Sequence, residues 1–164
     1  MRPQNWPDTI NYTNKTILNN NKEYPEHNYL EGVIIKEITN PNHKLFGEYG
    51  LFARRQWEKY EIIGEYCGLL SKYNEIDEKT RYLAQLYIDE SPEDTLYIDA
   101  NQYGNETRFI NDYRNIALEP NTTFVSSNIS GKQHILIIVT KQIKPYTEIL
   151  ADYGNDYWNY HSIK

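Results

Sequence analysis

The feature that most constrains the fold is an unbroken apolar and β-branched run at residues 134–140 (HILIIVT). A run without polar alternation predicts a strand that is buried on both faces, rather than one with a solvated side. Gly131 follows the polar residues 126–128 and indicates a hairpin turn directly before this strand. A strand of this kind needs sheet and core around it, so the chain is predicted to be rich in β-structure.

Several shorter segments also have strand-like composition and are separated by turn-forming residues: 33–38, 51–53, 61–66 and 96–99. Residues 75–86 are predicted to form a helix, with Asn74 as its N-cap. The sequence contains no internal repeat. Many short strands with turn signals and little helix are typical of a single, mostly β domain of the α+β type.

The length of 164 residues is enough for one domain that buries roughly 70% of the surface its unfolded chain exposes. Residues 1–30 are predicted to form an N-terminal extension, because residues 11–21 are polar, rich in asparagine and aperiodic. This part is expected to be loop-like, or ordered only by docking. The folded domain is predicted to span residues 31–164, including a short C-terminal tail.

Composition argues against several classes of protein. With Cys67 as its one cysteine, the chain cannot form an internal disulfide or a cysteine-rich zinc cluster, which fits an intracellular, reducing setting. It has no apolar run long enough to span a bilayer, and its N-terminus lacks the apolar core of a signal peptide. The net charge of −6 argues against general nucleic-acid binding and suits a basic peptide as partner. The histidines lack metal-ligand spacing, so surface or structural positions are expected for them: His27, His43, His134 and His161.

Two segments in the last third of the chain carry a family resemblance, residues 104–111 (GNETRFIN) and 148–154 (EILADYG). They resemble the two signature segments of the SET-domain protein lysine methyltransferases, often written GNxxRFINH and ELTFDYG. The resemblance covers nearly all of residues 33–158. It implies a SET fold of several small sheets, in which the first segment threads under a loop formed by the second. The result is a knot-like C-terminal core around a methyl-transfer channel.

The resemblance also implies roles for individual residues. Tyr153, in the ADYG sequence, corresponds to the catalytic tyrosine of the family. Tyr66, in EYCG, corresponds to the tyrosine that lines the channel for the substrate lysine, and Trp158 is expected to close that channel. Contacts to the methyl donor, S-adenosylmethionine (SAM), are implied for one further set: Glu48, Tyr49, Gly50, Tyr82, Arg108, Asn111, Asp112 and Tyr153.

This sequence departs from the family pattern at several of these positions. Glu48 stands where the family has the first glycine of its GxG segment, and Asp112 stands where it has histidine. Residues 113–114 (YR) replace the usual Ser-Cys. Many members close the site with a cysteine-bound zinc, which this chain cannot bind. Closure is therefore expected from residues 157–158 and the short tail that follows them.

Ala151 stands where the family usually carries Phe or Tyr, a position that limits how many methyl groups the pocket accepts. A smaller residue leaves volume for a methylated amine to turn and react again. The hypothesis that follows is a di- or trimethyl-lysine product, unless another aromatic residue such as Phe124 or Trp158 fills the space.

The chemistry itself favours such a site. Methyl transfer from SAM to an amine is an in-line displacement, so alignment is the main task of the enzyme. The lysine must be neutral, and with an ordinary pKa of about 10.4 only on the order of one molecule in a thousand is neutral near pH 7. Burial and a nearby sulfonium lower that pKa. Tyrosines suit the channel walls, since their faces favour methylammonium and their hydroxyls orient the nitrogen.

The sequence is therefore predicted to encode SAM-dependent methylation of a protein lysine on a histone tail, which is a basic peptide, without a metal. Alternatives are a non-histone substrate, or a catalytically silent SET module that binds a peptide or partner. Direct nucleic-acid or membrane binding is not expected, and a homodimer stays open. A histone substrate would place the protein in the nucleus or on chromatin. Six acidic residues between the Tyr66 and Tyr97 segments form either a solvated face or a surface that attracts the substrate: Glu75, Asp77, Glu78, Glu90, Glu93 and Asp94.

Overall fold

The structure is a computed structural model that describes residues 2–18, 30–77, 80–87, 94–155 and 157–158. Its strands are β1 (Asn11–Tyr12), β2 (Val33–Glu37), β3 (Tyr49–Ala53), β4 (Ile62–Glu65), β5 (Leu69–Lys72), β6 (Leu83–Tyr87), β7 (Leu96–Asp99), β8 (Tyr103–Gly104), β9 (Asn111–Asp112), β10 (Thr122–Ile129), β11 (Lys132–Val139) and β12 (Leu150–Ala151). Short 3₁₀ helices are η1 (Tyr73–Glu75) and η3 (Glu106–Phe109). Within the described residues, no helix has the length and apolar character needed to cross a membrane.

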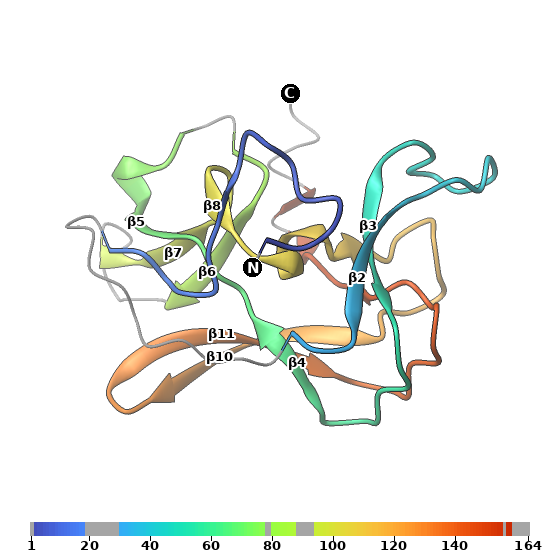
Figure 1. Cartoon of the computed structure of the whole chain (residues 1–164). Helices are drawn as coiled ribbons and strands as arrows, with labels where there is room; N and C mark the ends of the chain where they lie inside the picture. Colours follow the sequence, from blue (N-terminus) through green and yellow to red (C-terminus); the bar gives the residue numbers. More distant parts are fainter. Residues whose placement is uncertain (1, 19–29, 78–79, 88–93, 156, 159–164) are drawn as a thin grey trace.

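These strands form several small sheets rather than one large sheet (Figure 1). β10, β11 and β4 make one antiparallel sheet, and β5, β7 and β6 make a second. The β2–β3 pair is also antiparallel, whereas β1 pairs with β8 and β12 pairs with β9 in parallel. The predicted mostly β architecture of several small sheets is therefore confirmed.

β11 confirms the strand expected from the apolar run. Residues 134–137 are all buried, and the strand lies between β10 and β4 in its sheet. Ser130 and Gly131 connect β10 to β11 as a two-residue hairpin loop, with φ angles of 53° and 79°. Positive φ at both central positions is the geometry of a type I′ turn, which matches the twist of the strands it joins.

The helix predicted for residues 75–86 is wrong. Residues 73–75 form the short η1, and residues 83–87 form β6, which pairs antiparallel with β7 from Leu83 opposite Asp99. Leu86 is buried in the core. Pairing with a strand that lies later in the chain overrides the local helical preference, and this partner is invisible in the local pattern.

The described part of the N-terminal extension docks on the domain, in agreement with one of the two expectations for it. Trp6 is buried and makes edge-to-face contacts with the rings of Tyr12 and Phe109, with centroids 5.1 and 5.7 Å apart. β1 adds a short parallel pair to β8, directly before the η3 segment. Residues 19–29 lie outside the described part of the chain. The extension therefore braces the segment that carries the sequence RFIN.

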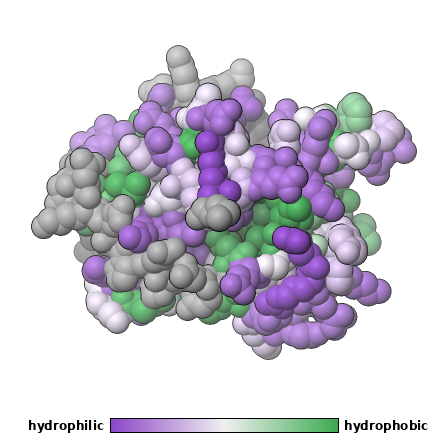
Figure 2. Space-filling model, in the orientation of Figure 1, coloured by the Kyte–Doolittle hydropathy of each residue, from purple (hydrophilic) through white to green (hydrophobic). Residues whose placement is uncertain are grey.

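The core extends between the sheets rather than within one layer. It includes Trp57, Leu51, Ile63, Ile110 and Ile149, each with at most 1% of its surface exposed. Figure 2 shows that polar side chains cover much of the face viewed, with apolar side chains visible mainly in a central band. Ile110 and Ile149 directly precede β9 and β12, so burial of these two side chains anchors the segments that build the candidate site.

Candidate active site

The two C-terminal segments that carry the family resemblance meet at the β9–β12 pair. Leu150 lies opposite Asn111, and Ala151 lies opposite Asp112. On the other side of β12, the Leu150 carbonyl accepts hydrogen bonds from the Asn121 backbone N–H at 3.1 Å and from a threonine hydroxyl at 2.9 Å. Residues 148–154 are therefore enclosed between two other stretches of chain, which matches the expected knot-like core.

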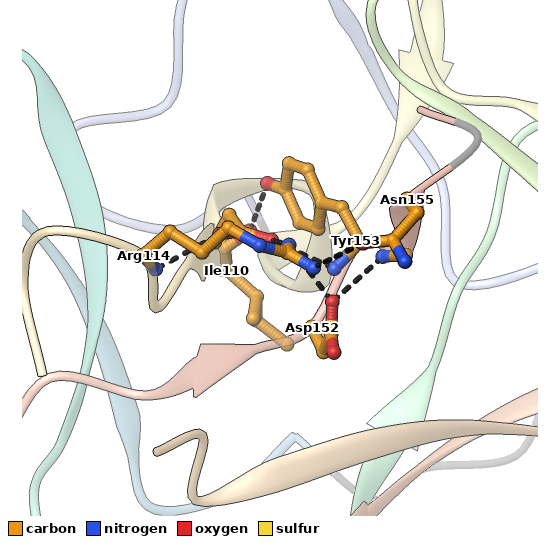
Figure 3. Close-up of polar contacts among 7 residues, drawn as sticks. Ile110, Arg114, Asp152, Tyr153 and Asn155 are labelled. Carbon is orange, nitrogen blue, oxygen red and sulfur yellow. Dashed lines mark hydrogen bonds and ion pairs between the residues drawn. The ribbon is translucent and has the colours of Figure 1, made fainter. Parts of the chain in front are cut away.

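Tyr153 follows β12 and is held at both ends of the residue. Its backbone N–H donates to Asp112 Oδ2 at 2.8 Å, and its hydroxyl donates to the Ile110 carbonyl (Figure 3). Burial raises the pKa of Tyr153 well above its ordinary value, so the hydroxyl stays neutral at physiological pH. Because its proton is directed to a carbonyl, the hydroxyl oxygen can act only as an acceptor toward a further group.

Tyr66 directly follows β4, and its hydroxyl is also neutral and hydrogen-bonded to a backbone carbonyl. It is buried, and its hydroxyl donates to the Tyr82 carbonyl at 2.9 Å. Burial raises the pKa of Tyr66 well above its ordinary value. The ring of Phe124 packs edge-on against it with centroids 5.5 Å apart. The site thus contains two neutral tyrosine hydroxyls, each with its proton donated to a backbone carbonyl.

Both tyrosines line one large pocket of about 1060 Å³, a size suited to a small molecule or cofactor. Tyr82 and Arg108 also line it, and the Arg108 guanidinium lies 3.9 Å from the centre of the Tyr82 ring. Arg108 is buried, and its Nε donates to the Ala100 carbonyl at 3.0 Å. This bond ties the RFIN segment to the YIDA segment, so Arg108 braces the pocket as well as lining it.

A second polar cluster forms around Asn111. Its side-chain nitrogen donates to the Tyr49 carbonyl at 3.2 Å and to Glu148 Oε1 at 2.9 Å. A Cβ atom placed on Gly50 would lie 2.7 Å from Glu148 Oε1 and 3.2 Å from the Asn111 nitrogen. A larger residue at this position would push the Glu148 carboxylate away from Asn111, so glycine suits the close approach of the β3 backbone to this cluster.

His43 completes this second cluster. Its Nε2 lies 2.9 Å from Glu148 Oε2, and its Nδ1 accepts the Leu45 backbone N–H at 3.0 Å. Since Nδ1 is used as an acceptor, the ring proton sits on Nε2 and is donated to the carboxylate. His43, Glu148, Asn111 and the Tyr49 carbonyl therefore form one connected chain of hydrogen bonds.

The structure brings the predicted residues together in two groups. Four of them, Tyr66, Tyr82, Arg108 and Tyr153, line the large pocket; Tyr49, Gly50 and Asn111 belong to the second cluster, and Asp112 lies next to Tyr153. The side chain of Glu48 is exposed. Ala151 is fully buried in the core, and neither it nor Trp158 is among the described residues lining the pocket.

The sequence alone assigns no functional role to Glu148 or Arg114, and it predicts only a surface or structural position for His43. Glu148 opens the second family segment, which is a signal that could have marked it, but its partner His43 is 105 residues away. Arg114 stands out in the sequence only as a departure from the family pattern. Within the described residues, no group of three or more His, Cys, Asp or Glu side chains is placed to hold a metal ion.

A protein-family model named SET domain matches residues 48–154. The chain belongs to the SET-domain family. The matched range includes β9, β12, Tyr66, Asn111 and Tyr153, so the residues of both clusters lie almost entirely inside it.

Curated relatives with this SET domain include "Histone-lysine N-methyltransferase trithorax" from Drosophila virilis, 32% identical over 107 residues. "Histone-lysine N-methyltransferase 2B" from Homo sapiens is 28% identical over 107 residues. The alignments cover 63% of this chain but only 3% and 4% of those proteins. The chain thus corresponds to a small part of the length of these relatives.

Solved SET-domain structures have the same fold. A structure titled "ctPRC2 in an autoinhibited conformation bound to S-adenosylmethionine" is 27% identical with a TM-score of 0.63, over 80% of this chain and 16% of that chain. The structure of ATXR5 in complex with histone H3.1 mono-methylated on R26 has a TM-score of 0.63 at 20% identity, over 74% of this chain and 57% of that chain. The latter likeness shows the fold alone.

Proposed function

We propose that this protein transfers a methyl group from SAM to a lysine side chain of another protein, with a histone tail as substrate. The observation that carries the proposal is the pair of hydroxyls of Tyr66 and Tyr153, which line one pocket. Each donates its own proton to a backbone carbonyl, and each stays neutral because burial raises its pKa. The pocket thus offers two acceptor oxygens beside several aromatic side chains.

This arrangement suits an amine that must attack as a neutral nucleophile. A lysine amine entering the pocket can donate its N–H groups to the oxygens of Tyr66 and Tyr153. With its N–H groups fixed in this way, the nitrogen lone pair points in one direction, which is what an in-line displacement requires. Desolvation between aromatic rings also lowers the pKa of the lysine and favours its neutral form.

The residues present fit SAM as the methyl donor. Gly50 allows close approach of the β3 backbone, and Asn111 and Asp112 lie on the adjacent β9. Tyr82 and Arg108 add an aromatic face and a cation to the wall of the large pocket. SAM is bound in the related ctPRC2 structure. We assign these residues, together with Tyr49 and Glu48, to the SAM side of the site.

A basic peptide is the substrate class that this chain's charge favours. The net charge of −6 attracts cationic segments, and relatives of this SET domain are named histone-lysine methyltransferases. A histone substrate would place the protein on chromatin. We keep the hypothesis that Ala151 permits di- or trimethylation, although the residue is buried in the core; mass spectrometry of fully turned-over product tests it, and monomethyl-lysine alone would contradict it.

The test is methyl transfer from labelled SAM onto core histones, with the wild type compared with Tyr153→Phe. Tyr146→Phe is the matched control, because Tyr146 is 74% exposed and lies outside the residues that line the pocket. Label on histones that disappears only in Tyr153→Phe supports the proposal.

Two other outcomes separate the alternatives. SAM binding without labelled histone would direct the search to non-histone proteins. SAM or peptide binding without turnover on any protein would identify a silent SET module. The Asp112 and Glu48 departures favour this alternative, whereas the retained Tyr153, Asn111 and Arg108 favour activity.

A further inference from the structure

Arg114 lies two residues after Asp112 and reaches across to the segment that carries Tyr153 (Figure 3). Its Nη1 lies 2.8 Å from Asp112 Oδ2 and 2.8 Å from Asp152 Oδ1. Its Nη2 donates to Asn155 Oδ1 at 3.3 Å. The Arg114 guanidinium therefore contacts Asp112 on β9. It also contacts Asp152 and Asn155, which lie before and after Tyr153 in the chain.

Asp112 links Arg114 directly to Tyr153. Its Oδ2 accepts both the Arg114 guanidinium and the Tyr153 backbone N–H, and its Oδ1 accepts the Arg114 backbone N–H at 2.9 Å. The Asp112 side chain is only 5% exposed. A carboxylate this buried needs a cation to remain charged at low cost, and Arg114 is the cation that contacts it.

Asp152 supplies the second contact. Its Oδ1 accepts the Gly154 backbone N–H at 2.8 Å as well as the guanidinium. Asp112 and Asp152 each lie 2.8 Å from Arg114 Nη1, so their carboxylates lie close to each other. Without the arginine between them, these two negative charges would repel. The planar guanidinium contacts both carboxylates through Nη1 and Asn155 through Nη2, a fixed geometry that the compact ammonium of a lysine reproduces only in part.

We propose that Arg114 is a positioning residue that holds Tyr153 at its place in the pocket by clamping Asp112, Asp152 and Asn155. The inference rests on the proposed methyl transfer. Tyr153 is attached at its backbone to Asp112 and at its hydroxyl to Ile110, so a shift of residues 152–155 moves the hydroxyl away from the amine. The residue acts on the chemical step through geometry and makes no contact with the reacting atoms itself.

The first test compares Arg114→Ala and Arg114→Lys with the wild type at saturating SAM and peptide. A displacement on the ångström scale can cost about 100-fold in rate. We expect kcat of Arg114→Ala to fall on the order of 10- to 100-fold, more than the change in KM for SAM, and Arg114→Lys to recover only part of the loss. Wild-type kcat in Arg114→Ala would overturn the proposal.

Chemical rescue separates positioning from a general loss of structure. Free guanidinium at non-denaturing concentration should restore part of the activity of Arg114→Ala, whereas sodium chloride at equal ionic strength should not. Arg55→Ala is the matched control, since Arg55 pairs with Glu61 at the surface and lies outside the pocket; guanidinium should leave its activity unchanged. Absence of rescue in Arg114→Ala would contradict the clamp.

A compensating substitution gives a test that can still be used if Arg114→Ala folds poorly. Asp152→Asn removes one of the two facing charges while its amide oxygen can still accept the Gly154 N–H. The double variant Arg114→Ala/Asp152→Asn should therefore be more active and more stable than Arg114→Ala alone. If Asp152→Asn worsens the Arg114→Ala variant, carboxylate repulsion is not the cause and the proposal fails.

A spectroscopic measurement distinguishes failure of the clamp from failure of the proposed function. Trp158 packs on Tyr157, which packs on Tyr153, with ring centroids 5.4 and 4.9 Å apart. In protein labelled with fluorotryptophan, the fluorine resonance of Trp158 should shift in Arg114→Ala and return with guanidinium, while that of Trp57, buried in the core, stays in place. If the wild type transfers no methyl group, this result still tests the clamp, and an unmoved Trp158 resonance overturns it.

Discussion

The two polar clusters on either side of β9 are built from different chemistry. The Asn111 cluster uses an amide, an imidazole and one carboxylate, and it holds the β3 backbone at a glycine. The Asp112 cluster uses a guanidinium and two carboxylates, and it holds Tyr153. Successive side chains of a strand point to opposite faces, so adjacent residues of β9 serve different clusters. In the proposed reaction, Asn111 therefore supports only the SAM side of the site, whereas its neighbour Asp112, assigned to the same side, also supports Tyr153.

This difference has a functional meaning within the proposed reaction. A network that contacts a ligand through backbone groups affects binding in the ground state, whereas a network that fixes a hydroxyl at the reacting nitrogen affects the transition state. Variants of the Asn111 cluster should therefore change the affinity for SAM. Variants of the pocket tyrosines and their supports should change the rate of transfer.

After Tyr153→Phe, the largest expected effect is that of Tyr66→Phe. Loss of its hydroxyl removes one of two acceptors for the amine, so we expect kcat to fall roughly 100-fold with little change in KM for SAM. Steady-state kinetics with a lysine peptide, and Tyr146→Phe as control, measure this. Equal losses in kcat and in SAM affinity would contradict the assignment of rate and SAM binding to different clusters.

The pH dependence of kcat/KM for the peptide is the next largest effect. Burial raises the pKa of both Tyr66 and Tyr153, so both stay protonated across the neutral range. The fraction of neutral lysine then governs the rate, and kcat/KM should rise about tenfold per pH unit between roughly pH 7 and 9. A falling limb in that range would show that an essential protonated group ionises there, contrary to the state assigned to the tyrosines.

Asn111→Ala should act mainly on binding. The substitution removes hydrogen bonds to the Tyr49 carbonyl and to Glu148, leaving a partly buried carboxylate with one partner fewer. A loss of about 1–2 kcal/mol corresponds to roughly a 5- to 30-fold weaker Kd for SAM. Isothermal titration calorimetry with SAM measures it. Unchanged SAM affinity would remove Asn111 from the SAM side of the site.

His43→Ala should have a smaller effect of the same kind. His43 acts through Glu148 on Asn111, so we expect SAM affinity to weaken about threefold to tenfold, with kcat nearly unchanged. His43→Gln, which keeps a donor for Glu148, should recover part of the affinity. If His43→Ala lowers kcat by a larger factor than it weakens SAM binding, His43 supports Tyr153 rather than Asn111.

The sequence predicted β11 and its turn well, because an unbroken β-branched run and a turn glycine are local signals. The helix predicted for residues 75–86 was wrong, because β6 is stabilised by pairing with β7 and the local sequence gives no sign of this partner strand. At the site, Tyr66, Asn111 and Tyr153 could be named because they stand in recognisable segments. His43 and Arg114 could not, since their roles depend on partners brought close by the fold, such as Glu148 at a separation of 105 residues and Asn155 at 41.

The most direct test of the account is to measure SAM affinity and methyl transfer on the same preparation of Tyr153→Phe. The phenylalanine keeps the ring and loses only the hydroxyl that we propose accepts a hydrogen bond from the amine. We expect a Kd for SAM within about threefold of the wild type and a transfer rate on histone lysine lowered roughly 100-fold or more. Transfer at the wild-type rate would contradict the assignment of Tyr153, and lost SAM binding would contradict the division of the site into two clusters.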